Sequence, residues 1–252
     1  MQEYNAVSRG AQTAAVDAGL QAYMSKVYAL MGIAMVVTGV VAYVVGMDFR
    51  AAVNGQETTL IPANVLATMF SSPVVYVIIF APLAMVFMFG AAINRLSTGA
   101  AQAFFWGFAA LIGLSISSIF AMYTGVSIAR TFLVTAIAFG GLSLWGYTTK
   151  KNLSGWGTFL MMGVIGLIAA MILNIFIASS ALQFAISAIG VLIFAALTAY
   201  DTQSIKNDYL QVAGRSGAEA YLEKGAIMGA LRLYLDFLNL FMFLLQFLGN
   251  RQ

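Results

Sequence analysis

Apolar residues follow one another in long runs, without the alternating or amphipathic patterns of a water-soluble domain. Residues 27–47, 58–94, 96–129, 131–149 and 152–200 contain no charged side chain, and residues 226–248 contain two. A bilayer core of about 30 Å is crossed by about 20 helical residues. The pattern predicts seven membrane-spanning helices. They lie at residues 27–47, 73–94, 103–123, 129–148, 157–178, 182–205 and 226–248. A polar loop at 206–225 precedes the last of them.

Composition supports an all-α integral membrane protein. The chain has 252 residues, of which 62% are hydrophobic and 8% charged, whereas soluble domains carry about 25% charged residues. Residues 1–26 are polar and are expected to form a cytoplasmic N-terminal segment, with residues 27–252 forming the seven-helix transmembrane domain. No removable signal peptide is apparent.

The absence of two residue types restricts the chemistry. The chain has no Cys and no His, which removes thiolate and imidazole nucleophiles, common zinc ligands and the usual haem ligand. We therefore expect neither an enzyme nor a resident cofactor. The net charge of +3 comes from basic residues scattered singly between apolar runs, so it indicates membrane orientation rather than nucleic-acid binding.

The basic residues also predict the orientation. Eight Lys or Arg residues fall in the N-terminal segment and in the loops on the same side of the membrane, against three on the other side. Because positive charge gathers in the cytoplasm, we expect a cytoplasmic N-terminus and an external C-terminus. The bilayer is the expected environment of the rest of the chain.

Two acidic residues in the last two helices need an explanation. Asp201 ends the apolar run of one predicted helix, and Asp236 lies about ten residues inside the next. A charged group at the centre of a membrane helix costs at least about 2.5 kcal/mol. Both fall in the cytoplasmic half, where they could share a proton if they met, or pair with Arg232, one turn before Asp236, or with Arg95.

Other residues offer weaker signals. Pro82 lies in the middle of its predicted helix and is expected to kink it, which makes it a possible hinge. Gly32, Gly39 and Gly46 recur every seven residues and predict close helix packing along one stripe. Asn174 and Asn239 are candidates for hydrogen bonds between helices.

Several segments together resemble the Bax inhibitor-1 family, also called transmembrane Bax inhibitor motif proteins, in its bacterial form. They read LTAYDTQSIK at 197–206, LRLYLDFLNLF at 231–241 and GLSLWGYTTKKNLSGWGTFL at 141–160. The resemblance implies seven helices with the last one surrounded by the other six, in a bacterial inner membrane. It also implies a pH-dependent calcium leak, a proton-sharing pair at Asp201 and Asp236, and a basic latch at Arg95.

Two hypotheses about function follow. In the first, the protein mediates a pH-sensitive calcium leak gated by the aspartate pair. Asp201 and Asp236 would then form a weak, transient Ca²⁺ site, and Arg232 would modulate it. In the second, the protein regulates partners such as a membrane protease or cell-death effectors, and the buried acids are structural. A proton-coupled transporter is a third, less favoured possibility, because no internal repeat is evident.

Overall fold

The computed structural model describes residues 2–71, 73–93, 95–213, 215 and 217–250, with side chains from residue 16 onward. Within these ranges the chain forms helices and turns and no strand. The helices are α1 (Gln2–Val53), α2 (Ala63–Met69), α3 (Val74–Ala92), α4 (Thr98–Ile116), α5 (Ile119–Met122), α6 (Gly125–Thr148), α7 (Trp156–Ile177), α8 (Ser180–Val212) and α9 (Ala218–Leu248).

The seven expected membrane helices are confirmed as α1, α3, α4, α6, α7, α8 and α9, because these are long and apolar enough to cross a bilayer. The predicted loop at 206–225 is wrong in extent. α8 continues to Val212 and α9 begins at Ala218. Hydropathy measures the length of the apolar run, whereas a helix continues into water as long as its backbone hydrogen bonds are made.

The first helix also exceeds its apolar run. α1 is continuous from Gln2 to Val53, so the proposed domain boundary at residue 26 falls inside one helix. Leu20, Tyr23 and Met24, which precede that boundary, are buried in the core. The polar lead-in is therefore packed as part of the bundle, at least from residue 20 onward.

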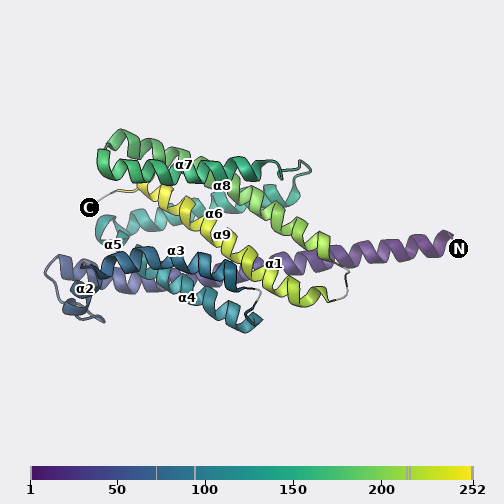
Figure 1. The fold of residues 1–252 in the computed structure, drawn as a ribbon, viewed down its shortest axis with the longest axis horizontal. Helices are drawn as coiled ribbons and strands as arrows, with labels where there is room; N and C mark the ends of the chain where they lie inside the picture. The colour runs from purple at the N-terminus through teal and green to yellow at the C-terminus, as the bar shows by residue number, and fades with distance from the viewer. Residues whose placement is uncertain (1, 72, 94, 214, 216, 251–252) are drawn as a thin grey trace.

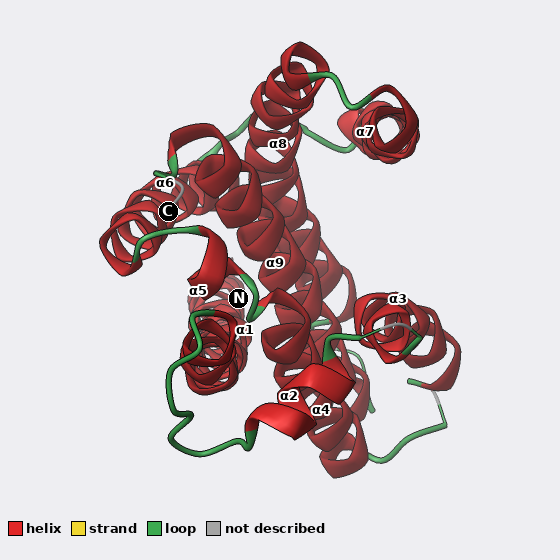
Figure 2. Cartoon of the chain, turned by 90° about the vertical axis from the view of Figure 1, so that its left-hand side faces the viewer, coloured by secondary structure: helices red, strands yellow, loops and turns green. Residues whose placement is uncertain are grey.

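α9 is the central helix of the bundle (Figures 1 and 2). It packs against α1, α4, α6 and α8, whereas α3 packs mainly on α4 and α7 on α8. In its most apolar stretch 67% of the residues are buried, compared with 11–39% in the other six membrane helices. The last helix is thus enclosed directly by four neighbours, and α3 and α7 form an outer layer.

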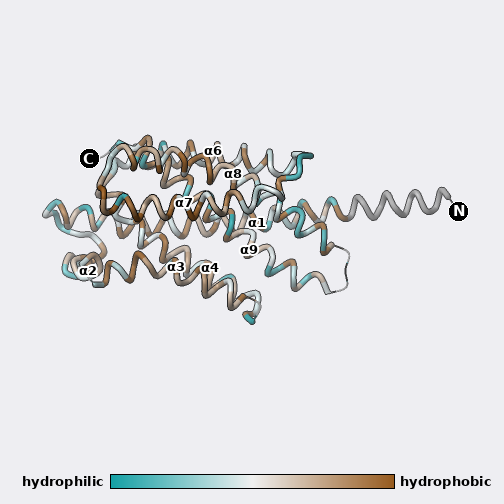
Figure 3. The backbone as a smooth tube through the Cα atoms, turned by 45° about the horizontal axis from the view of Figure 1, so that its top comes forward, coloured by the Kyte–Doolittle hydropathy of each residue, from teal (hydrophilic) through white to brown (hydrophobic). Residues whose placement is uncertain are grey.

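The outward faces of the helices are apolar. Figure 3 shows hydrophobic residues along the middle of the bundle and hydrophilic residues gathering toward its ends. Phe176 on α7 is 81% exposed and Phe87 on α3 is 71% exposed. Large exposed apolar side chains all around a bundle require a lipid environment, so the protein is integral to the membrane.

Glycines allow close helix contact, but mostly not where the sequence pattern predicted it. An added Cβ at Gly113 of α4 would lie 2.6 Å from the Thr38 carbonyl oxygen of α1, and one at Gly146 of α6 would overlap the backbone of Ala199 in α8. Gly32 and Gly39 instead face open space. Of the predicted stripe, only Gly46 makes a close approach, to Ser117 and Phe120.

Buried hydroxyls tie α1 and α4 to the central helix. The Thr38 hydroxyl donates to the carbonyl oxygen of Ala109 at 2.8 Å. Its one proton is therefore used, so it accepts from the hydroxyl of the fully buried Tyr234 at 2.7 Å. The predicted interhelical role of Asn174 is confirmed by its bond to Gln183 of α8. Asn239 instead donates to the Leu235 carbonyl within α9.

Asp48, which the sequence reading did not single out, organises the end of the bundle opposite to the N-terminus. This buried carboxylate accepts the backbone N–H groups of Thr59 at 2.8 Å, Leu60 at 2.8 Å and Ile61 at 2.7 Å. Three charge-assisted hydrogen bonds to consecutive amides hold the segment after α1 against the helix end.

Replacing Asp48 with Ala is expected to lower the melting temperature of the folded protein, because three N–H groups lose a charged acceptor. Thermal unfolding in detergent is the measurement. Glu57 lies in the same segment and is exposed, so Glu57→Ala is the matched control and should leave the melting temperature unchanged. Equal melting temperatures for both variants would contradict the role given to Asp48.

Candidate functional site

The site lies between α8 and α9, the two helices that carry the predicted aspartates. Asp201 is partly buried on α8, and Asp236 is 4% exposed on α9. Their side chains are hydrogen-bonded to each other. The structure therefore brings together two residues that are 35 positions apart, because α8 and α9 are packed against each other and α9 begins only a few residues after the end of α8.

This contact requires a proton. An ionised carboxylate can only accept hydrogen bonds, so two carboxyl groups can bond to each other only if one of them is protonated. The second oxygen of Asp236, Oδ2, is buried and has no hydrogen-bond partner among the described residues. A buried polar atom without a partner is rare and marks strain, function or a bound species. Asp201 and Asp236 thus form a close carboxyl pair, the dyad, in which Oδ2 of Asp236 lacks a partner in the described part of the chain.

An ion pair between Arg232 and Asp208 lies next to the dyad, on the side where α8 is connected to α9. The Arg232 Nη1 atom is 3.8 Å from Asp208 Oδ2, and the two side chains are 44% and 48% exposed. Arg232 also interacts electrostatically with both members of the dyad, and Asp208 with Asp201. Exposed ion pairs contribute only about 0–1 kcal/mol, so Asp208 holds Arg232 weakly.

Helix periodicity explains this stacking of two pairs. Asp208 follows Asp201 by two turns on α8, and Arg232 precedes Asp236 by one turn on α9. Residues at these spacings share a helix face. The sequence analysis does not single out Asp208, because this residue lies after the apolar run, in the predicted loop at 206–225. Its spacing of two helical turns from Asp201 is nevertheless a usable signal.

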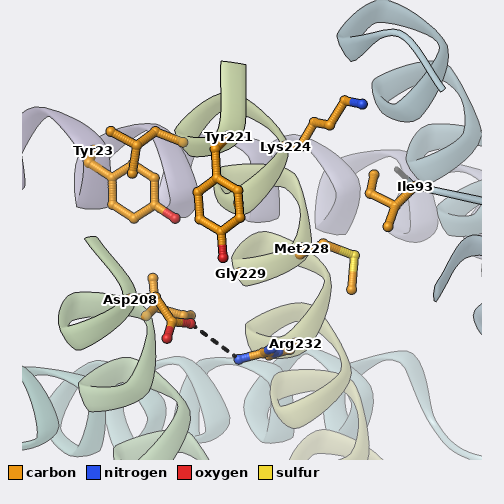
Figure 4. Close-up of a pocket in the computed structure, with 11 residues that line it drawn as sticks. Tyr23, Ile93, Asp208, Tyr221, Lys224, Met228, Gly229 and Arg232 are labelled. Carbon is orange, nitrogen blue, oxygen red and sulfur yellow. Dashed lines mark ion pairs between the residues drawn. The ribbon is translucent and has the colours of Figure 1, made fainter. Parts of the chain in front are cut away.

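A cavity of about 180 Å³ opens above Arg232 (Figure 4). Asp208 and Arg232 line its inner part, and Tyr23, Tyr221 and Lys224 line the rest. α1, α8 and α9 all contribute to it. The half-exposed Arg232 and Asp208 thus line this cavity, whereas neither member of the dyad does.

The other two predicted site residues lie apart from the dyad. Arg95, in the turn between α3 and α4, is exposed and forms no ion pair with a described residue. Pro82 is buried inside α3, which runs from Val74 to Ala92 without a break. In this structure the cation beside the dyad is therefore Arg232 rather than Arg95.

Among the described residues no group of three or more acidic side chains is placed to hold a metal ion. Calcium prefers six to eight oxygen ligands, and the dyad offers at most four.

Fold and site define a seven-helix integral membrane protein with a carboxyl pair buried between its last two helices. The chain belongs to the Bax inhibitor-1 family, because the family profile described as "Inhibitor of apoptosis-promoting Bax1" matches residues 20–252. The resemblance seen in the sequence is thereby confirmed. Proteins of this family are generally not enzymes.

Bacterial relatives match along nearly their whole length. The inner membrane protein YbhL of Escherichia coli K12 is 44% identical over 236 residues, covering 93% of this chain and 94% of YbhL. A protein of Caulobacter vibrioides is 44% identical over 242 residues, covering 94% and 92% of the two chains. YrjE of Lactococcus lactis is 38% identical over 232 residues, covering 92% of each.

Proposed function

We propose that this protein mediates a pH-sensitive leak of calcium across the membrane, gated by Asp201 and Asp236. The observation that carries the proposal is the protonated contact between the two carboxyls at the core of the bundle, with Oδ2 of Asp236 left without a partner. A shared proton that joins two membrane helices makes their separation depend on pH.

The closed state is the one in which the dyad holds a single proton. Loss of that proton leaves two like charges in contact, and gain of a second removes the charge-assisted character of the bond. Either change weakens the link between α8 and α9. Loss of the proton also leaves two carboxylates, whose oxygens are the hard ligands that calcium favours.

The peripheral position of α3 supports a role as the moving element. It packs mainly on α4, and only 17% of its most apolar stretch is buried. Pro82 removes one backbone hydrogen bond from this helix, which makes it the proposed hinge. With the N-terminus in the cytoplasm, as the basic residues predict, the dyad and the cavity above it face the cytoplasmic side.

The direct test is calcium entry into dye-loaded liposomes that contain the purified full-length chain, measured from about pH 5 to pH 8. Flux above that of empty liposomes, varying with pH, is the expected result. No flux at any pH would overturn the proposal and favour the partner-binding alternative. In that alternative, a membrane protein regulated by this chain is recovered in stoichiometric amounts with the full chain. It is lost on deletion of residues 1–19, which stops short of the buried Leu20.

Arg232 is expected to limit cation entry from the cavity. Because a fixed positive charge at a narrow entrance repels calcium, Arg232→Gln should raise calcium flux roughly threefold, as estimated from local charge focusing. Arg50 lies in the last turn of α1 at the other end of the bundle, so Arg50→Gln is the matched control. A flux that falls in Arg232→Gln, or rises equally in both variants, would contradict this assignment.

A further inference from the structure

A groove unrelated to the dyad runs between α1 and α6. Its volume is about 740 Å³, which lies within the range of small-molecule sites, about 300–1,000 Å³. The walls are α1 from Asp17 to Tyr28 and α6 from Phe139 to Tyr147. Tyr28 and Ser143 bridge the two helices by a hydrogen bond of 2.5 Å.

The groove changes from polar to apolar along its length. Asp17, Gln21 and Ser25 repeat every four residues, so they share one face of α1 at the outer end of the groove. Phe139, Leu144 and Met24 supply apolar surface. An occupant with one polar end and one apolar end matches this arrangement.

The depth of the groove matches the boundary of the membrane. Trp145, next to Leu144 on α6, is 44% exposed on the outer surface, and exposed tryptophans mark the headgroup level. Lys150 and Lys151 follow in the turn just beyond the end of α6. The apolar part of the groove therefore begins where acyl chains begin, and its polar end lies among headgroups.

The hydrogen bonds below the groove leave an acceptor facing it. Thr202 donates to the Thr198 carbonyl, so it accepts from Ser143 at 2.9 Å. Ser143 must then accept from the hydroxyl of Tyr28. The Tyr28 proton is thereby used, and its remaining lone pair can only accept.

Charge complementarity selects the headgroup. Among the described residues that line the groove, Asp17 is the one that carries a charge. A carboxylate at the outer end and a hydroxyl oxygen restricted to accepting together favour a ligand that donates hydrogen bonds and carries positive charge. An anionic headgroup would place its net negative charge beside the Asp17 carboxylate, which repels it.

We propose that this groove binds a phospholipid with a primary ammonium headgroup, such as phosphatidylethanolamine. The ammonium group lies at Asp17, Gln21 and Ser25 bind the phosphate through their donors, and an acyl chain packs against Phe139 and Leu144. The lipid bridges α1 and α6 at the end of the bundle that holds the dyad. This site is independent of the calcium leak.

The test is lipid titration of the delipidated full-length protein in detergent, followed by native mass spectrometry. Phosphatidylethanolamine should bind about tenfold more tightly than phosphatidylcholine with the same acyl chains, because methylation removes every N–H donor. Asp17→Asn should remove most of this preference. Phosphatidylglycerol, which is anionic, should bind no better than phosphatidylcholine.

Two neighbouring glycines provide a matched pair of variants. Gly140 lines the groove and Gly141 does not, and an added Cβ at either position meets no atom within 4 Å. Gly140→Leu should fill the groove and abolish the preferential binding, whereas Gly141→Leu should retain it.

Equal binding of all three lipids to the wild-type protein would mean only a nonspecific lipid annulus and would overturn the proposal. Preference for phosphatidylglycerol would overturn the headgroup assignment. Unchanged binding in Gly140→Leu would overturn the location. If Gly140→Leu instead displaced a bound peptide and left lipid binding unchanged, the groove would be assigned to a protein partner.

Discussion

Replacing Asp236 with Asn is expected to remove the pH dependence of calcium flux. Asn has the shape of Asp but does not titrate between pH 5 and 8, so the dyad can no longer gain or lose a proton at this position. The contact with Asp201 is worth about 1.5–3 kcal/mol as a charge-assisted hydrogen bond. The amide N–H of the introduced Asn can still donate to the Asp201 carboxylate, so we expect the link between α8 and α9 to persist while its dependence on a proton is lost.

The measurement is flux into dye-loaded liposomes at several pH values, with Asp201→Asn tested in parallel. Asp208→Asn is the matched control, since Asp208 lies on the same face of α8 but is half exposed and bonded to Arg232 rather than to Asp236. It should keep a pH-dependent flux. An unchanged pH profile in both Asp201→Asn and Asp236→Asn would contradict gating by the dyad.

Replacing Gly146 with Ala is expected to cause the largest loss of stability from a single added methyl group. The new Cβ would overlap the backbone of Ala199, so α6 and α8 would have to separate. Overpacking against backbone costs about 1–3 kcal/mol, and more where the neighbour cannot move. Since Ala199 is in the middle of α8, we expect about 3 kcal/mol and poor recovery of folded protein.

Thermal unfolding in detergent, together with the yield of monodisperse protein, measures this effect. Gly141→Ala, on the same helix but facing open space, is the matched control. It should be neutral or slightly stabilising, because Ala favours helix over Gly by about 1 kcal/mol. A Gly146→Ala protein as stable as Gly141→Ala would show that α6 and α8 do not pack as described.

Much of the fold follows from the sequence because a bilayer imposes a single strong constraint. Every backbone polar group in the membrane must be satisfied within the chain, so each long apolar run becomes a helix. This reasoning located all seven membrane helices. It did not locate their ends, because Lys206 to Val212 and Ala218 to Gly225 are polar but remain helical outside the apolar core.

Packing was less predictable. The glycine period on α1 suggested a contact stripe, yet Gly32 and Gly39 face outward while Gly113 and Gly146 make the close approaches. In a membrane both lipid-facing and buried positions are apolar, so hydropathy does not separate them. Only the tertiary structure shows which small residue lies opposite a neighbouring backbone.

The sequence alone determined that Asp201 and Asp236 are costly in a membrane and occupy the same half of it, since cost and depth depend on local composition. The tertiary arrangement decided three further facts. The two aspartates share a hydrogen bond, Arg232 pairs with Asp208, and Arg95 lies apart from the aspartates in this structure. These facts depend on the rotation of α8 and α9 about their helix axes and on the way α3 packs against α4. The rotation of each helix and its position against its neighbours are determined by many side chains packing together, so no single motif along the chain encodes them.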